Sequence, residues 1–431
     1  MPSPNWTLHV EGFGPIRKAE LDVRPLTLLV GENSTGKSYL ATLLWGLAQT
    51  NRVSPFPKSP VQEPVYELLD KLLKENSHQL TLSRNNLEQI FTLTNSLLSR
   101  IKHYFIARLF NSPLIGANSV SIHLSPGPFD ANPQTISLIA RVEVHPRAFL
   151  SQLQFSTTLN HGLGLGGDFR AKYLPASRTG FMLTYPYVVS RGIEGLLSDV
   201  EEVGDPAAVS RTRLTRPTIE FLKLLATGTD EGSHFLSEAQ ALEESLGGEI
   251  VKHSQAGFNQ YEYRMKGAET NLPMSIVSTM VSELAPIITV LKSSDKIPFL
   301  VIEEPEAHLH PKVQRTLAVV IARLIRKGVR VVLTTHGDLF CHQLNNLIKL
   351  GSLPEPKRRA LQKRFKLKET DYLLPQEVSG YGLTISKDRT HSVVEALKMT
   401  PYGLEMPTFN AEIDSLEAQT DALDQAIEAL Q

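Results

Sequence analysis

The segment Gly31–Ser38, which reads GENSTGKS, constrains this chain more than any other feature of its sequence. It satisfies the pattern G-x-x-x-x-G-K-[ST] and stands between an apolar run, Leu26 to Val30, and a helix-like run, Ser38 to Leu47. Glycines let such a backbone curl so that its N–H groups point at phosphate oxygens. We expect a P-loop in which Lys37 reaches the β- and γ-phosphates of a nucleotide and Ser38 ligates Mg²⁺. The residues predicted to contact the nucleotide are Gly31, Glu32, Asn33, Ser34, Thr35, Gly36, Lys37 and Ser38.

A second apolar strand, Pro298 to Ile302, runs directly into the carboxylates Glu303 and Glu304. Carboxylates at this position lie at the carboxyl edge of a parallel sheet, where nucleotides bind. Successive strand residues point to opposite sides, so we expect different roles for the two. Glu303 would orient Mg²⁺ through water, and Glu304 would polarise the attacking water as general base. The alternative is a solvated acidic turn, because Pro305 and Glu306 follow.

The next apolar strand, Val329 to Thr334, ends at Thr335 and His336. A histidine at a neighbouring strand end can hydrogen-bond the γ-phosphate or the attacking water. We therefore add His336 to Glu304 as a predicted catalytic residue. An ordinary histidine at the edge of the sheet is the alternative.

Composition and charge exclude several classes of protein. The 44 Lys and Arg residues balance 45 Asp and Glu residues, and the formal charge of −1 argues against a basic coat for nucleic acid or acidic lipid. The single cysteine, Cys341, allows neither an intrachain disulfide nor a cysteine-rich zinc site, and indicates a reducing, cytoplasmic location. We expect no signal peptide, because the start of the chain, Met1 to Asn5, has no basic region followed by an apolar region. We expect no membrane-spanning helix, because no apolar run approaches about 20 residues.

In this order, the three motifs resemble the ABC-type ATPase heads of the SMC, RecF and OLD group, above all the OLD-like ATPases of prokaryotic genomes. Gly14 to Ile16 and the P-loop look like the opening of that family. Glu303 to Pro311, which reads EEPEAHLHP, resembles its extended Walker B and D-loop, and Thr335-His336 resembles its switch histidine. Two shorter strings, Tyr173 to Arg178 and Gly403-Leu404 followed by Phe409, resemble further elements of the family.

The resemblance implies an α/β fold, a P-loop ABC-type ATPase head with a mixed sheet, flanking helices and a helical and mixed inserted lobe. ATP and Mg²⁺ are the implied cofactors, and ATP hydrolysis is the implied reaction. We expect residues 1–50 and 271–431 to form the head and residues 51–270 to form the insertion. Within the insertion we expect helices at 61–110, strand-rich head elements at about 120–180 and a helical part at about 190–250.

One motif departs from the family pattern. In the family, the signature region resembles Ser-Ser-Gly. In ABC-type heads this region contacts the γ-phosphate of the nucleotide that is bound to the opposing subunit. Ser278 and Thr279 fit the hydroxyl positions, but Met280 stands where glycine is usual and could hinder close backbone approach. An ordinary helix N-cap is the alternative for Ser278.

Arg178 follows Pro175 and is expected in a short turn. The resemblance implies that it lies near the active site, as a charge-stabilising group. A surface arginine is the alternative.

Two charged segments stand outside these motifs. The first crowds seven basic residues together and could bind a phosphate backbone, although a solvated helix surface is the alternative: Lys357, Arg358, Arg359, Lys363, Arg364, Lys366 and Lys368. The second, Glu412 to Gln431, is a predicted helix with six acidic residues and no basic one. Its apolar residues fall at heptad-like spacing, so it either docks a partner or second subunit or packs on its own domain.

We find no Asp-x-Asp pair after His336 and expect no nuclease of the TOPRIM type in this chain. Relatives of this kind look like the ATPase halves of two-gene anti-phage systems such as PARIS and Septu. Our leading hypothesis is an ATP-hydrolysing subunit that self-associates and controls a separately encoded effector, with a phage protein as a possible trigger. One alternative is a RecF-like repair ATPase that binds DNA directly. The other is a scaffold that binds ATP without turnover.

Overall fold

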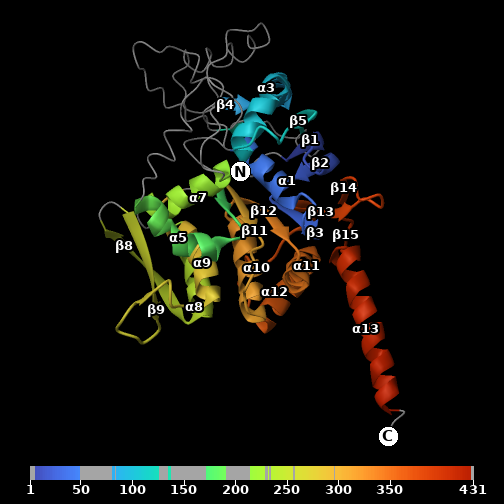
Figure 1. Ribbon diagram of the computed structural model, residues 1–431. Coiled ribbons are helices and arrows are strands. Elements are labelled where there is room, and N and C mark those ends of the chain that lie inside the picture. Colours follow the sequence, from blue (N-terminus) through green and yellow to red (C-terminus); the bar gives the residue numbers. More distant parts are fainter. Residues whose placement is uncertain are drawn as a thin grey trace.

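The computed structural model describes residues 5–48, 80–82, 84–125, 134–136, 171–190, 214–228, 232, 234–255, 258–295 and 297–428. At its centre lies a nine-stranded mixed sheet with the order β5-β1-β2-β14-β13-β3-β12-β11-β7 (Figure 1). The strands of this sheet are β1 (Trp6–Phe13), β2 (Ile16–Val23), β3 (Leu26–Gly31), β5 (Ser119–Leu124), β7 (Lys172–Leu174), β11 (Phe299–Glu303), β12 (Arg330–Thr335), β13 (Val378–Ile385) and β14 (Ser392–Ala396).

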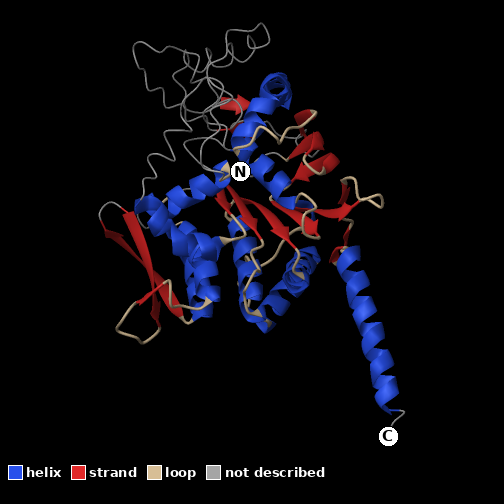
Figure 2. Ribbon diagram, viewed as in Figure 1, coloured by secondary structure: helices blue, strands red, loops and turns tan. Residues whose placement is uncertain are grey.

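Helices flank this sheet (Figure 2). They are α1 (Lys37–Ala48), α3 (Arg84–Phe110), α5 (Arg178–Ser190), α7 (Arg216–Thr227), α8 (Leu236–Leu246), α9 (Thr279–Lys292), α10 (Pro311–Arg326), α11 (Asp338–Ser352), α12 (Glu355–Arg364) and the 3-10 turn η3 (Pro375–Glu377). A further helix, α13 (Pro407–Glu428), ends the described chain. Three small sheets complete the described elements: β8 (Gly248–Gln255), β9 (Phe258–Met265) and β10 (Leu272–Pro273); β15 (Met399–Thr400) and β16 (Gly403–Leu404); β4 (Leu80–Leu82) and β6 (Gln134–Ile136). The predicted α/β class with a mixed sheet and flanking helices is confirmed.

The central strands are buried on both faces, which explains why β3, β11 and β12 read as unbroken apolar runs. Alternate residues enter separate cores because strand side chains alternate in direction. Leu300 and Ile302 pack in one core together with α9, α10 and α11. Phe299 and Val301 pack in the other core together with α1 and α3. The sheet therefore carries a layer of helices on each side.

Strand direction determines which loops meet. β3 runs parallel to β12 and β13, and β11 runs parallel to β12 and β7. β1 pairs antiparallel with β2 and β5, and β14 pairs antiparallel with β13. The carboxyl ends of β3, β12, β11 and β7 consequently lie at one edge of the sheet.

The inserted stretch mixes sheet strands with peripheral elements. β5 and β7 belong to the central sheet, whereas α7, α8 and the β8–β9 hairpin form a lobe beside it (Figure 1). Of the stretch predicted to be helical at 61–110, the part from residue 84 onward lies in α3. The first part of that stretch, residues 61–79, and most of the strand-rich region predicted at about 120–180 lie outside the described residues. The division into a head of residues 1–50 and 271–431 and an insertion of residues 51–270 stays a prediction.

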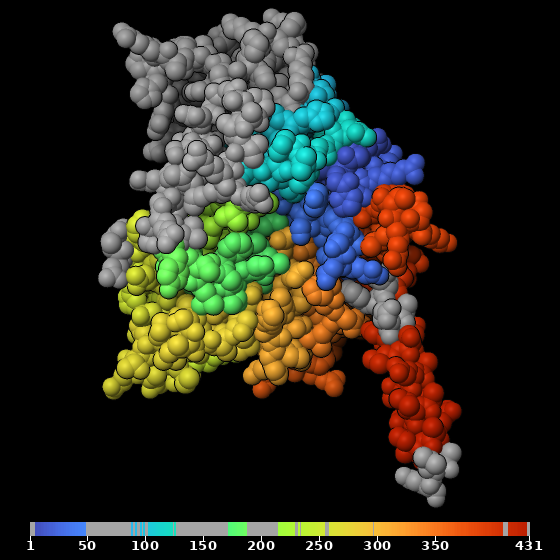
Figure 3. All heavy atoms as spheres, viewed as in Figure 1, coloured from blue at the N-terminus to red at the C-terminus, as the bar shows by residue number. Residues whose placement is uncertain are grey.

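Helix α13 extends away from the rest of the structure (Figures 1 and 3). Residues 414–428 of this helix are exposed along their whole length. Among the described residues, no helix is long and apolar enough to cross a membrane.

Candidate active site

The candidate site lies where the carboxyl ends of the parallel strands meet. The P-loop follows β3, the carboxylates Glu303 and Glu304 stand at the end of β11, and His336 follows β12. The segment Pro175 to Arg178 follows β7 at the neighbouring position. An open α/β sheet binds its ligands at this edge.

The P-loop backbone requires both of its glycines. Gly31 has φ +149°, and a Cβ built on it would lie 2.1 Å from the backbone oxygen of Leu383 in β13. Gly36 has φ +96°, and a Cβ there would approach the side chain of Ile16 at 3.0 Å. Because any other residue collides or is strained at these positions, the glycines fix the curl of the loop.

Lys37 is the first residue of α1 and is only 6% exposed. Its Nζ donates to the backbone oxygens of Gly31 and Glu32, each at 2.7 Å, so the side chain lies along the loop. Burial lowers the pKa of Lys37, while the facing carboxylates, Glu304 first among them, act in the opposite direction. The structure thus brings the ammonium of the P-loop together with the carboxylates that end β11.

Glu303 is 7% exposed and faces the start of α1. One carboxylate oxygen, Oε2, accepts from the Ala176 N–H at 3.3 Å, whereas the other, Oε1, is buried without a hydrogen-bond partner. Burial raises the pKa of Glu303, and hydroxyls of Ser38 and Tyr173 nearby oppose that rise.

An unpartnered buried carboxylate oxygen beside a serine hydroxyl fits a magnesium site. Mg²⁺ prefers oxygen ligands and is held by one or two carboxylates together with phosphates and water. Among the described residues, no three or more His, Cys, Asp or Glu side chains cluster in a way that could hold a metal ion.

Glu304 lies one residue beyond the strand and has a left-handed backbone, φ +42°. Its N–H donates to the backbone oxygen of Thr334 at 2.8 Å, which fixes it to the end of β12. Its Oε1 lies 3.6 Å from Nδ1 of His336, and both side chains are partly exposed. The two predicted catalytic residues are therefore neighbours that face solvent.

Glu306 is a site residue that the sequence prediction missed. It is 6% exposed, and its Oε1 accepts from the Thr335 hydroxyl at 2.6 Å and from the His336 N–H at 3.1 Å. It therefore holds the loop that carries His336. The sequence does show a third carboxylate close to Glu303 and Glu304. Its hydrogen-bond partners, however, lie at the end of a different strand, β12, and a local sequence pattern does not reveal them.

Arg178 corrects two predictions. It is the first residue of α5 rather than part of an isolated turn, and it is 0% exposed, so the surface-arginine alternative is wrong. Its guanidinium donates to the backbone oxygens of Glu303 and Glu304 and pairs with the Glu283 carboxylate of α9 at 3.0 Å. Since its donors are engaged by the protein, the geometry favours a positioning role over contact with phosphate.

Ser278 stands at the N-cap of α9 with an extended backbone, but its side chain makes no capping hydrogen bond. Ser278 and Thr279 are exposed, whereas Met280 is partly buried and packs against the core. Within the described residues, no hydrogen bond joins Ser278 to the P-loop of the same chain. The structure therefore leaves the Ser278 hydroxyl free at a helix N-terminus.

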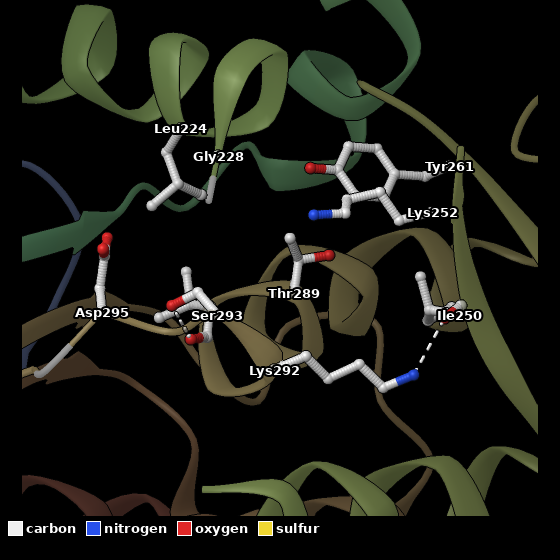
Figure 4. A pocket seen from close by; sticks show the side chains of 10 residues that line it. Leu224, Gly228, Ile250, Lys252, Tyr261, Thr289, Lys292, Ser293 and Asp295 are labelled. Carbon is white, nitrogen blue, oxygen red and sulfur yellow. Dashed lines mark hydrogen bonds between the residues drawn. The ribbon is translucent and has the colours of Figure 1, made fainter. Parts of the chain in front are cut away.

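A separate cavity lies away from this edge, between α7, α9 and the β8–β9 hairpin (Figure 4). Thr289 and Tyr261 line it, and Lys292 at its border donates to the backbone oxygen of Ile250 at 3.0 Å. None of the predicted site residues lines this cavity.

Two family models match the chain. Residues 7–145 match a model described as "AAA ATPase domain", and residues 187–341 match one described as "AAA domain, putative AbiEii toxin, Type IV TA system". The first segment contains the P-loop, and the second contains Glu303, Glu304 and His336. The chain matches no curated protein.

Solved structures show a distant likeness. The SMC head bound to the C-terminal winged-helix domain of ScpA is 13% identical, with 93% of this chain and 98% of that one covered and a TM-score of 0.41. The head with an extended coiled coil bound to the C-terminal domain of ScpA from Pyrococcus furiosus is also 13% identical, with coverages of 97% and 100% and a TM-score of 0.40. The Thermotoga maritima SMC head domain is 11% identical, with coverages of 92% and 99% and a TM-score of 0.35. The family matches and the geometry of the site together support a P-loop ATPase domain of the AAA type.

Proposed function

We propose that the chain binds ATP with Mg²⁺ at the P-loop and hydrolyses it. The observation that carries this proposal is the convergence of Lys37, Glu303, Glu304 and His336 at one sheet edge, beside the carboxyl ends of β3, β11 and β12. Lys37 exchanges its two backbone acceptors for phosphate oxygens when ATP binds. Glu303 and Ser38 would hold Mg²⁺, which would neutralise charge on the β- and γ-phosphates.

In the proposed reaction, Glu304 accepts a proton from the attacking water. As the water oxygen forms its bond to the γ-phosphorus, the bond from that phosphorus to the bridging oxygen breaks, and ADP leaves with the electron pair. His336, 3.6 Å from Glu304, hydrogen-bonds the γ-phosphate or the water and reports which nucleotide is bound. Arg178 fixes the backbone that carries both carboxylates.

We further propose that two copies associate through their heads when ATP is bound. The free hydroxyls of Ser278 and Thr279 lie at the N-terminus of a 14-residue helix, which favours an anionic group. Met280 packs toward the core, so its side chain does not cover this end of α9. This placement supports contact with the γ-phosphate of an opposing copy despite the missing glycine.

The biological role that we propose is control of a separately encoded effector, such as a nuclease, in prokaryotic anti-phage defence. Support comes from the resemblance to OLD-like ATPases and from the toxin–antitoxin wording of the model matched by residues 187–341. Nucleotide state would shift head association and thereby release or restrain the effector. Co-expression with the neighbouring gene tests this role. Phage resistance that requires both genes and an intact Lys37 supports it. Resistance that persists when the neighbouring gene is left out, or when Lys37 is replaced, contradicts it.

Head association has its own test. Glu304→Gln should trap ATP, so that this variant forms a larger species with Mg-ATP in size-exclusion chromatography with light scattering. Adding Ser278→Arg should prevent that association without weakening ATP binding. The matched control is Ser237→Arg, an exposed serine in the first turn of α8. Equal association of the two arginine variants would contradict the assignment of Ser278.

Of the two alternatives, direct DNA binding has specific support. The exposed basic surface at 357–368 favours direct DNA binding, which steep salt-dependent binding of a duplex would reveal. A scaffold without turnover would bind ATP tightly and release no phosphate. The pairing of Glu304 with His336 favours turnover over the scaffold.

A further inference from the structure

Helix α13 carries an apolar stripe that the described structure leaves uncovered. Leu416, Leu423 and Ile427 are 63%, 58% and 55% exposed and, together with Ile413, recur at heptad-like spacing. The helix makes no extensive contact with any other described element (Figure 3). Exposed apolar residues in a continuous stripe indicate a contact surface.

The flanks of this stripe are acidic. Five described side chains on α13 are exposed and form no ion pair with any other described residue: Asp414, Glu417, Asp421, Asp424 and Glu428. A parallel or antiparallel pair of two such helices would place like charges together, which disfavours α13 as its own partner. The surface that binds this stripe of α13 must therefore offer cationic side chains beside an apolar one.

The same chain offers such a surface around α12. We define the basic surface as the exposed residues Lys357, Arg359, Lys363, Arg364, Phe365, Lys366 and Lys368. Phe365 is 57% exposed, so an apolar side chain lies among the cations. Arg359 pairs with Glu355 at 2.7 Å, whereas four lysines of the surface form no ion pair within the described part of the chain.

We propose that α13 of one copy docks on the basic surface of a second copy. Leu416 and Leu423 would meet Phe365, and the acidic flanks would meet the unpaired lysines. One helix-on-helix contact is small compared with a stable interface of about 1,200–2,000 Å², so we infer a reciprocal exchange in a two-fold dimer that makes the contact twice. This interface goes beyond the proposed head association, because it uses neither the P-loop nor α9 and needs no nucleotide.

Sedimentation velocity of the full chain without nucleotide, at low and high salt, tests the proposal. We expect concentration-dependent dimers at low salt that dissociate as salt screens the opposing charges. Lys363→Glu with Lys366→Glu should abolish the dimer, and so should Asp421→Lys with Asp424→Lys. A matched control, Lys266→Glu with Lys387→Glu, reverses two exposed lysines elsewhere and should leave the dimer intact.

Mixing gives the decisive outcome. Each charge-reversed variant repels itself, but a one-to-one mixture of the two restores both contacts and should dimerise like the wild type. Lys37→Ala should dimerise normally, which separates this interface from the proposed ATPase function. A monomeric wild type, or a mixture that stays monomeric, overturns the proposal. The proposal is also overturned if the wild type is monomeric and Lys363→Glu with Lys366→Glu abolishes its binding of duplex DNA. The basic surface would then bind nucleic acid rather than α13.

Discussion

Arg178 provides a demanding test of the site, because one buried guanidinium holds several parts of it. The residue is 0% exposed and its partner Glu283 has a side chain that is 3% exposed. Arg178→Met leaves that carboxylate buried without its cation and removes donors from the backbone oxygens of Glu303 and Glu304. Removing one member of a buried ion pair costs about 3–5 kcal/mol, and we expect a loss of this size in the free energy of unfolding.

Urea unfolding followed by tryptophan fluorescence measures this loss. Both tryptophans, Trp6 and Trp45, are buried at 1% and 2% exposure, so their emission should change on unfolding. The double variant Arg178→Met with Glu283→Gln removes both charges. It should lose less than the sum of the two single variants, by about 0.5–3 kcal/mol. Additive losses, or an Arg178→Met variant within about 0.5 kcal/mol of the wild type, would refute the buried pair.

Arg178→Lys separates positioning from simple structural support. Lysine keeps a charge for Glu283 but carries its donors on one flexible nitrogen, so it cannot reproduce the planar fork with which Arg178 reaches Glu283 and both backbone oxygens together. We expect kcat for ATP hydrolysis to fall about 10- to 100-fold from a small displacement of Glu304, with little change in KM. A rise in KM with unchanged kcat would instead place Arg178 in nucleotide binding.

Three further predictions concern glycine, carboxylate and thiol. Gly31→Ala should abolish ATP binding, because its Cβ would meet the Leu383 backbone oxygen, whereas Gly180→Ala in α5, with nothing within 4 Å, should bind ATP normally in the same titration. Burial raises the pKa of Glu303, so the folded chain holds the carboxyl proton of Glu303 more tightly than the unfolded chain does. The folded chain therefore loses stability as the pH rises from the pKa of the unfolded state through the raised pKa of the folded state. Glu303→Gln should accordingly raise the Tm of the magnesium-free protein at neutral pH, with the gain shrinking toward acid pH; an unchanged or lower Tm at neutral pH would be inconsistent with this. Burial likewise raises the pKa of the Cys341 thiol, which is 0% exposed, so a thiol reagent should label one site per chain only after unfolding, and rapid labelling of the native protein would contradict the burial.

Local patterns predicted the elements that form the edge of the sheet. The apolar runs at 26–30 and 298–302 lie in β3 and β11, and the run that begins at Ser38 is α1. These runs are readable because a strand buried on both faces needs apolar residues throughout. The P-loop was readable for a similar reason, since its glycines are required by local backbone geometry.

Long-range partners were not readable from local patterns. Arg178 and Glu283 are 105 positions apart, and only the packing of α5 against α9 brings them together. Glu306 likewise supports a loop that follows the next strand. The packing of Met280 against the core is likewise set by the residues around α9, which a local pattern does not show.

The central claim is that Glu304 activates water for ATP hydrolysis at this sheet edge. Steady-state phosphate release by the wild type, Glu304→Gln and the control Glu355→Gln, an exposed carboxylate on α12, tests it most directly. We predict that Glu304→Gln still binds ATP but hydrolyses it about 10²- to 10⁴-fold more slowly, the usual contribution of a general base, while Glu355→Gln matches the wild type. Hydrolysis by Glu304→Gln at the wild-type rate would contradict the account.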